Sequence, residues 1–254
     1  MLISPKRLQR FWRIHPEVVM HIGAHKAEEL RDYADLGWGS QATVWLEALP
    51  HKAEYVKELV ADLPHHTVIT AVVWDKAGET IEFNETNNGQ SSSALKLKDT
   101  AGLYPHIVVT EVVKRVTSTV ADLVDFDALG RVGLVNLDIQ GAELRALQGF
   151  GANIALVDAV YAEVNVRELY EGCAMLPDVD EWMSGQGFTR VDWVILPGVG
   201  WGDALWVRNA HVPRNAAARR FVRRVLDIPS ALKFRLFTVY RRINPVKLDL
   251  TPSR

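Results

Sequence analysis

The chain has 254 residues, of which 48% are hydrophobic and 24% are charged, and its formal net charge is −2. These values fit one large soluble α/β domain, with or without a small extension. The single cysteine, Cys173, excludes an internal disulfide framework, and no stretch is apolar enough for a signal peptide or a membrane-spanning helix, so we expect a cytoplasmic protein.

The first strand and the turn after it form the motif on which the interpretation depends. Pro5 predicts a short helix to about Arg13, and the apolar run from Val18 to Ile22 predicts a buried strand that ends at Gly23. Helical periodicity then predicts a helix from Lys26 to Leu36. A strand, a turn of small residues and a helix N-terminus let a ligand approach the backbone and the positive end of the helix dipole.

The second predicted strand, Thr43 to Ala48, carries an acid that suits a nucleoside. Glu47 lies 24 residues after Gly23, where a carboxylate accepts hydrogen bonds from a ribose diol, and this indicates an adenosine-containing cofactor. The turn has one glycine where dinucleotide-binding turns have three, so S-adenosylmethionine, which has no phosphate, fits better than a pyrophosphate. An ordinary strand-to-helix turn is the alternative. The expected cofactor contacts are Gly23, Ala24, His25, Glu29, Glu47 and Asp138.

The next segments predict a β-α-β-α-β order with an antiparallel addition. A helix is expected from Pro50 to about Leu63, and a third strand from Thr67 to Trp74. A turn at Asp75 to Gly78 and the alternating run Thr80 to Phe83 predict a hairpin.

The polar loop from Asn87 to Ser93 allows two interpretations. It is either a solvated linker or a lid whose amide and hydroxyl groups bind a polar ligand. In the second reading the acceptor contacts in this loop are Asn88, Gln90, Ser91 and Ser92.

Two later strands end on acids. After a short strand and helix at Val116 to Val124, the strand Val132 to Ile139 brings Asp138 to the edge where open α/β sheets bind ligands. The turn at Gln140 follows, and Glu143 in the first turn of the next helix stabilises the helix dipole.

The strand from Val157 to Asn165 places Glu163 and Asn165 on one face. With Asp138 they offer oxygen ligands for magnesium or calcium; the alternative is a hydrogen-bond network with helix N-termini and water. His106 is either a general base or a surface histidine.

The two histidines of the first motif need not share a face, because they lie on a strand end and a turn. We expect His25 to contact the cofactor loop and His21 to lie beside the core. A helix from Asp178 to Gly185 and strands at Thr189 to Leu196 and Ala204 to Arg208 complete the domain. The connection between these strands is too short for a crossover helix, so they should be antiparallel.

A resemblance to a known family rests on five segments: His21–Glu29, Trp45–Ala48, Asn87–Ser93, Asn136–Leu144 and Glu163–Asn165. In this order, and over roughly residues 18 to 208, they resemble the FkbM family of S-adenosylmethionine-dependent methyltransferases. The sequence departs from the family pattern at three positions, since Gln140 replaces the usual Glu, His21 stands where many members have Asp, and Ala27 where they have Gly.

The resemblance implies a Rossmann-like class I methyltransferase fold: a mostly parallel seven-stranded sheet with an antiparallel C-terminal strand pair and helices on both faces. It also implies O-methylation of a hydroxyl group on a sugar, oligosaccharide or glycolipid. Asp138, Glu163 and His106 are then the catalytic candidates, and Gln140 and Asn165 further acceptor contacts. The alternatives are methylation of a polyketide or other small-molecule hydroxyl, and a cofactor-binding protein without transferase activity.

The end of the chain is strongly basic. The segment from Arg208 onward carries twelve Lys or Arg and two Asp, so its charge is +10 and the preceding residues carry −12. Helices are expected from Ala216 to Leu226 and from Pro229 onward. They either pack on the domain or on a second subunit in a homodimer, or dock on an anionic membrane as a peripheral anchor. Nucleic acid is not expected, because the body is acidic and has no base-reading motif. The expected division is a helical segment at 1–17, the domain at 18–210 and a basic helical extension at 211–254.

Overall fold

The computed structural model describes residues 1–98 and 104–222, and the chain divides into two compact units, 1–213 and 214–254. In the second unit, residues 216–222 form a helix. The rest of the predicted basic extension, with the helix expected from Pro229, lies outside the described residues. No helix in the described part of the chain is long and apolar enough to cross a membrane.

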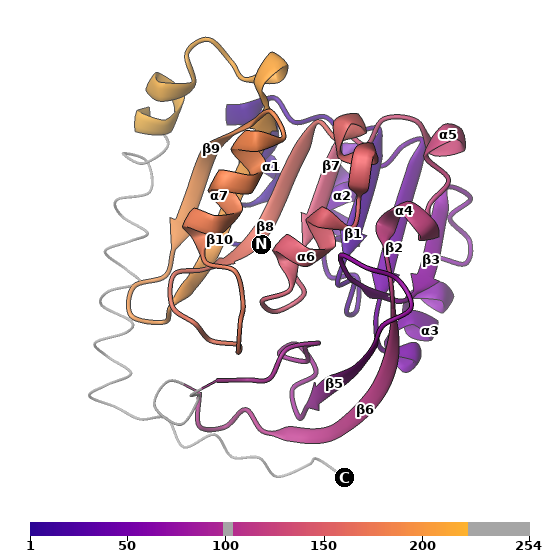
Figure 1. The fold of residues 1–254 in the computed structure, drawn as a ribbon. Helices are drawn as coiled ribbons and strands as arrows, with labels where there is room; N and C mark the ends of the chain where they lie inside the picture. Colours follow the sequence, from indigo (N-terminus) through magenta and orange to yellow (C-terminus); the bar gives the residue numbers. More distant parts are fainter. Residues whose placement is uncertain (99–103, 223–254) are drawn as a thin grey trace, which may run out of the picture. The chain divides into compact units, whose positions relative to one another are not determined.

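A seven-stranded sheet forms the centre of the first unit (Figure 1). The strand order is β3-β2-β1-β7-β8-β10-β9. β10 runs antiparallel to β8 and β9, and the other neighbouring strands pair in parallel. The predicted mostly parallel sheet that closes with an antiparallel pair is therefore confirmed. The strands of this sheet are β1 (Val18–Ile22), β2 (Ala42–Glu47), β3 (His66–Thr70), β7 (Leu134–Leu137), β8 (Ala159–Asn165), β9 (Phe188–Ile195) and β10 (Trp201–Arg208).

Helices cover both faces of the sheet, as expected. In Figure 1, α4, α6 and α7 lie in front of it and α1 and α2 behind it. The helical elements are α1 (Pro5–Arg7), the π-helix η1 (Leu8–Trp12), α2 (Leu30–Leu36), α3 (Pro50–Leu59), α4 (Val120–Leu123), α5 (Phe126–Leu129), α6 (Glu143–Gln148), η2 (Gly151–Leu156), α7 (Leu176–Gly185) and η3 (Asn209–His211).

The central strands are apolar because both of their faces are covered. Every residue of β1 and β7 is buried, which is typical of parallel strands between two helical layers. Phe150, Met183 and Trp206 join the same core and are at most 1% exposed. Each such side chain contributes about 1.5–3 kcal/mol on burial. This core fixes the strand ends at which the polar residues lie.

The N-terminal residues 1–17 belong to the first unit. Ile3, Leu8 and Trp12 are at most 1% exposed. The Trp12 indole donates a hydrogen bond to Asp192 Oδ2 at 2.8 Å, and the Ile3 amide donates to the Tyr161 hydroxyl at 3.0 Å. The segment therefore packs against the β8, β9 and β10 side of the sheet.

The predicted helix start at Lys26 is wrong. His25 and Ala27 have φ angles of 48° and 53°, a left-handed conformation that a helix excludes, and α2 begins at Leu30. The amides of Gly23 and Ala24 both donate to Leu46 O, at 2.9 and 3.0 Å. The turn therefore bonds to the end of β2 and does not direct its N–H groups toward a ligand.

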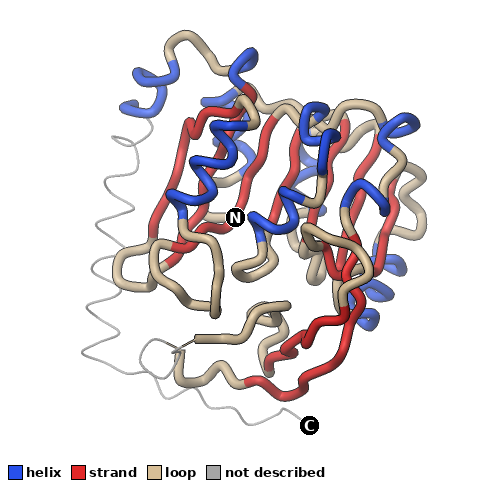
Figure 2. The backbone as a smooth tube through the Cα atoms, in the orientation of Figure 1, coloured by secondary structure: helices blue, strands red, loops and turns tan. Residues whose placement is uncertain are grey.

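The predicted third strand and hairpin are also corrected. The run from Thr67 to Trp74 is divided at Ala71, whose amide donates to Glu47 O. After this break β4 (Val72–Val73) leaves the main sheet and pairs in parallel with β6 (Val109–Ser118), and β5 (Thr80–Thr86) pairs antiparallel with β6. The hairpin does not form because β6 lies between β4 and β5. Figure 2 shows this smaller sheet below one end of the main sheet.

Gly23, just after β1, lies close to the backbone of Asp138, just after β7, and its replacement tests the turn. It has a φ of 90°, and an added Cβ would lie 2.0 Å from Asp138 O. Gly78 has a φ of 80° but open space around the added atom, so Gly78→Ala measures backbone strain alone. We expect Gly23→Ala to lower the free energy of unfolding by about 3 kcal/mol and Gly78→Ala by about 1 kcal/mol, measured by urea denaturation. Equal losses would show that the close approach to β7 is not a constraint.

Candidate functional site

Two neighbouring cavities lie at the carboxyl ends of β1, β2 and β7. Counted with the open solvent at its mouth, the smaller encloses about 560 Å³ and the larger about 1400 Å³. Gly23, His25, Gln90 and Asp138 line both. Because the two cavities share these residues, a single elongated ligand can extend from one into the other.

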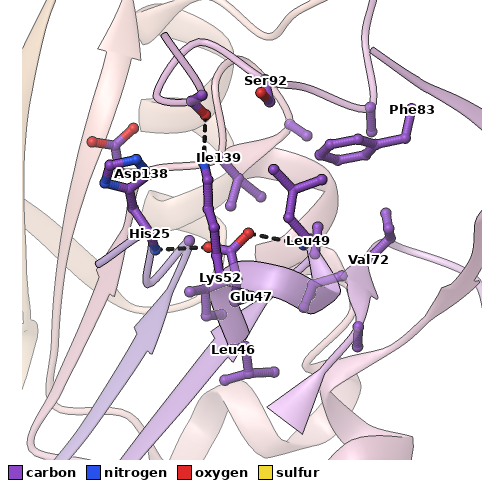
Figure 3. A pocket seen from close by; sticks show the side chains of 18 of the residues that line it. His25, Leu46, Glu47, Leu49, Lys52, Val72, Phe83, Ser92, Asp138 and Ile139 are labelled. Carbon is purple, nitrogen blue, oxygen red and sulfur yellow. Dashed lines mark hydrogen bonds between the residues drawn. The ribbon is translucent and has the colours of Figure 1, made fainter. Parts of the chain in front are cut away.

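The smaller cavity joins an apolar wall to two carboxyl groups, those of Glu47 and of the shared Asp138. Leu49, Val72 and Phe83 form much of the wall (Figure 3). Glu47, at the end of β2, is only 6% exposed. Its Oε2 accepts from the His25 amide at 2.7 Å and its Oε1 from the Leu49 amide at 2.9 Å. Glu47 therefore holds the turn after β1 against the start of α3, besides facing the cavity.

Lys52 lines the smaller cavity and was not expected from the sequence. Its Nζ donates to Gly89 O at 2.7 Å and so ties α3 to the loop 87–93 (Figure 3). Burial lowers its pKa, although the charge of Glu47 acts in the opposite direction. A lysine in the first turn of a helix is unfavourable because its charge opposes the helix dipole. Its place at the start of α3 was therefore the sequence signal that could have marked Lys52 as a site residue.

The residues of the turn between β1 and α2 differ in whether they face the cavities. His25 lines both cavities, and its Nδ1 lies 2.6 Å from Glu28 Oε1. Burial acts to raise the pKa of Glu28, but the hydrogen bond with His25, the charge of His25 and two backbone hydrogen bonds together lower it below its ordinary value. Ala24, an expected cofactor contact, is 1% exposed and lines neither cavity.

His21 lies beside the core, as its sequence context predicts. It is 3% exposed, stacks on Trp45 with 5.1 Å between ring centroids, and burial lowers its pKa. Its Nε2 is 4.0 Å from Glu29 Oε2. Glu29 lines only the larger cavity, on the opposite side of the turn from Glu47.

Gln140 organises the larger cavity. Its Nε2 donates to Asp138 Oδ1 at 2.6 Å and to Glu163 Oε1 at 3.3 Å, and its Oε1 accepts from the Tyr170 hydroxyl at 2.6 Å. An amide can do both at once because it has donor and acceptor ends. The φ of Gln140 is 57°, so the turn holds this side chain at some conformational cost.

The two carboxyl groups that Gln140 joins are easily protonated. Burial raises the pKa of Asp138 to about 6, and the nearby Asp203 adds to the effect. Burial and the charges of Asp138 and Glu143 hold the pKa of Glu163 well above its ordinary value. Asp138 also has exposed surface, which faces the two cavities. A proton can therefore be gained or lost here near neutral pH.

The loop 87–93 covers both cavities and is fixed to the sheet. Asn88 and Ser91 line the larger cavity, Ser92 the smaller one, and Gln90 both. Much of their hydrogen bonding is within the loop: Asn88 Oδ1 accepts from the Ser91 amide, and Ser92 Oγ accepts from the Thr86 amide. Ser93 Oγ donates to Gln140 O at 2.8 Å, which links the loop to the carboxylate pair.

Aromatic side chains line the far end of the larger cavity. The Trp201 indole donates to the Tyr104 hydroxyl at 2.8 Å, and Tyr170, which donates to Gln140, lines the same cavity. None of these three residues was expected from the sequence. The only signal for them there is a tryptophan between two glycines in a polar connection, where a large aromatic residue is unusual. His106, the candidate base, is exposed at the same end, with its ring 6.4 Å from that of Tyr104.

The predicted metal ligands do not come together as a set. Asp138 and Glu163 share the larger cavity, but Asn165 is 1% exposed and lines neither cavity. Its amide nitrogen and oxygen have no hydrogen-bond partner. Within residues 1–98 and 104–222, no three His, Cys, Asp or Glu side chains are placed to hold a metal ion. The residues present therefore do not fit the expected cation site.

Comparison with known proteins gives a family. Residues 21–189, more than half of the chain, match the model of the methyltransferase FkbM domain. No curated protein matches the chain.

Three solved structures are similar to parts of this chain at low identity. The methyltransferase FkbM of Methylobacillus flagellatus KT is 13% identical over 74% of this chain and 42% of its own, with a TM-score of 0.46. This chain thus spans less than half of that one. Magnesium protoporphyrin IX methyltransferase of Synechocystis PCC 6803 is 11% identical over 75% and 69%, with a TM-score of 0.42. Aeropyrum pernix fibrillarin is 11% identical over 76% and 67%, with a TM-score of 0.44.

Glu143 is buried close enough to Asp138 and Glu163 for their charges to interact, and its titration should make the stability of the fold depend on pH. Burial raises its pKa to about 7, although its carboxylate accepts hydrogen bonds from the Ile139 and Gly141 amides. The folded state therefore holds this proton more tightly than the unfolded state does. The resulting stability is complete below the unfolded pKa of 4.5 and is lost as the pH rises through about 7.

We expect the wild type to lose about 2 kcal/mol more stability than Glu143→Gln between pH 5 and pH 8 in urea denaturation. Asp138 and Glu163 titrate in the same direction in both proteins, but Glu163 no longer feels the charge of Glu143 in the variant, so the difference measures Glu143 together with its effect on Glu163. Glu58→Gln, on the exposed face of α3, is the control and should follow the wild type. If Glu143→Gln also follows it, Glu143 is not the group that titrates.

Proposed function

The chain belongs to the FkbM methyltransferase family, and we propose that it transfers the methyl group of S-adenosylmethionine to a hydroxyl group of a saccharide. The observation that carries this proposal is the pair of cavities that meet at Asp138. One is small, largely apolar and has an acid at a strand end. The other is larger and is lined by polar and aromatic side chains, which suit the binding of a second substrate.

The smaller cavity fits the adenosine part of the donor. Its apolar residues, among them Val72 and Phe83, suit the faces of a purine ring. Each oxygen of Glu47 already accepts one backbone hydrogen bond, but a carboxylate oxygen has a second acceptor position. Glu47 can therefore receive the ribose hydroxyls while it still holds the turn. The donor would then extend past Gly23 and Asp138 into the larger cavity.

When bound, S-adenosylmethionine supplies an electrophilic methyl group on a sulfonium. The chain must align the acceptor oxygen with the carbon–sulfur bond and keep water out, and this alignment is the larger part of the catalysis. The loop 87–93 suits this task because Lys52 and Ser93 fix it over the shared residues of the two cavities. The carbon–sulfur bond breaks as the carbon–oxygen bond forms, and the sulfur keeps the electron pair.

The hydroxyl proton goes to the Asp138–Glu163 pair. A base with a pKa near the working pH is the most effective, and the raised pKa of Asp138 meets this condition. Gln140 holds both carboxylates through its amide, so they remain in place as the proton arrives. His106 is the alternative base at the aromatic end of the cavity.

The lining of the larger cavity suits a saccharide. Asn88, Gln90 and Ser91 offer partners for hydroxyl groups, and Tyr170 and Trp201 offer flat apolar faces. A polyketide or other small-molecule hydroxyl is the rival acceptor. Binding of the donor without any transfer would make the chain a cofactor-binding protein of the same fold.

The partner predictions for the basic extension remain predictions, because most of it lies outside the described residues. In the described part, Phe221 is 70% exposed, on the helical residues 216–222. Docking to an anionic membrane and packing in a homodimer both stay open to test.

Substitution of Glu47 tests the donor end. Glu47→Gln should weaken binding of S-adenosylhomocysteine about tenfold in calorimetry, because it loses the charge and one of its acceptor oxygens. Glu54→Gln, on the exposed side of α3, should bind as the wild type does. Unchanged affinity in Glu47→Gln would remove this residue from the donor site.

Substitution of Asp138 tests the transfer step. With methyl-labelled donor and a panel of glycosides and lipid extracts, Asp138→Asn should lower the rate about 100-fold while the affinity for S-adenosylhomocysteine changes about threefold or less. Activity should persist in chelator; loss in chelator and recovery with magnesium would restore the predicted cation. Donor binding without transfer to any acceptor would favour the cofactor-binding rival.

A further inference from the structure

We infer that the acceptor carries a protonated amine close to its hydroxyl groups, as an amino sugar does. This inference rests on the proposed function and names the class of acceptor for the same site. Three observations carry it: the charged groups that line the larger cavity, the position of Glu163 within it, and the aromatic faces beside that residue.

Among its described lining residues, the larger cavity has four carboxyl groups and one amino group, that of Met1, besides three histidines. Its acidic lining residues are Glu28, Glu29, Asp138 and Glu163. No Lys or Arg lines it within residues 1–98 and 104–222. The other charged or titratable groups are His21, His25, His106 and the amino group of Met1, which lies 3.7 Å from Glu29 Oε1. A phosphate or carboxylate on the acceptor would therefore meet like charges and find no guanidinium or lysine ammonium partner.

Of these acids we assign Glu163 to the acceptor, because the donor enters the larger cavity past Asp138. Glu47, proposed to hold the ribose, lines only the smaller cavity, and Glu163 lines only the larger one. Asp138 lies between them and is within reach of both ligands. Glu163 extends from β8 toward the end where Tyr170 and Trp201 lie, which is the acceptor end.

Glu163 has the capacity to bind a cation. Its Oε1 accepts one long hydrogen bond from Gln140, and its Oε2 has no hydrogen-bond partner among the described residues. Burial makes the charged form of this carboxyl group unfavourable in the free protein. An ammonium at hydrogen-bond distance reverses this preference, because an opposite charge stabilises the carboxylate. The site is therefore better satisfied by a cation than by a neutral hydroxyl group.

The aromatic residues strengthen the preference. Trp201 and Tyr104 are joined by a hydrogen bond, so the pair forms a fixed surface in the same cavity. An aromatic face attracts an ammonium group as well as the apolar face of a sugar ring. The same lining therefore distinguishes an amino sugar from its neutral parent and, more strongly, from a uronic acid.

Calorimetry with matched methyl glycosides tests the inference. The full-length chain is saturated with S-adenosylhomocysteine and titrated with the 2-amino, the 2-acetamido, the neutral and the uronate glycoside, in both the gluco and the galacto series. We expect the amino glycoside of one series to bind about tenfold more tightly than its neutral parent. The acetamido glycoside should bind like the neutral one, since it has no charge, and the uronate more weakly than either.

The opposite ranking overturns the inference. Equal affinity of the amino and neutral glycosides, tighter binding of the uronate, or no binding of any amino glycoside would each contradict it. If S-adenosylhomocysteine itself does not bind, the proposed function fails instead, so the two failures are distinguishable.

A variant assigns the effect to one residue. Glu163→Gln keeps the size of the side chain and removes its charge, so the ratio of the affinities for the amino and the neutral glycoside should fall to about twofold or less. A merely structural loss would weaken both glycosides equally. Glu168→Gln, an exposed acid on the following loop, is the control and should keep the full advantage. If Glu163→Gln does not fold, Glu28→Gln at the 49% exposed rim should show a smaller reduction of the same kind. Retention of the full advantage in either test variant would contradict the assignment.

Discussion

The carboxylate of Glu47 holds the ligand-facing end of the sheet together. It accepts hydrogen bonds from the amides of His25 and Leu49, which belong to the turn after β1 and the residue before α3. The carbonyl of Leu46 accepts from Gly23 and Ala24 beside it. These bonds draw the turn toward β2 and account for the left-handed backbone of His25. They delay the start of α2, and the space above the strand ends becomes the two cavities.

A second constraint divides the two cavities by chemistry. The amide of Gln140 binds Asp138 and Glu163 through one end and Tyr170 through the other. A glutamate at this position would bring a third carboxyl group into the pair, whereas the amide screens their repulsion with two N–H donors. On one side of this pair the walls are apolar around Glu47, and on the other they are acidic and aromatic. The proposed donor and acceptor ends follow from this difference.

The sequence predicted the parts of the fold whose cause is local. Buried parallel strands are continuous apolar runs, so the main-sheet strands and the polar residues at their ends could be located. The left-handed turn at His25 and Ala27 could not, because alanine disfavours a positive φ and the amide of His25 is held by the Glu47 carboxylate on another strand. The pairing of β5 with β6 depends on a segment more than twenty residues away, which no local pattern records. Lys52 enters the site from a helix that was predicted only by its periodicity, and Trp201 from a segment that was predicted as a connection between strands.

The most direct test of the account is a crystal structure of the protein with S-adenosylhomocysteine. It should place the adenine against Val72 and Phe83, the ribose hydroxyls on Glu47, and the sulfur beside Asp138, facing the larger cavity. An adenine bound at the aromatic end near Trp201, or a ligand that makes no contact with Glu47, would contradict the assignment of the two cavities.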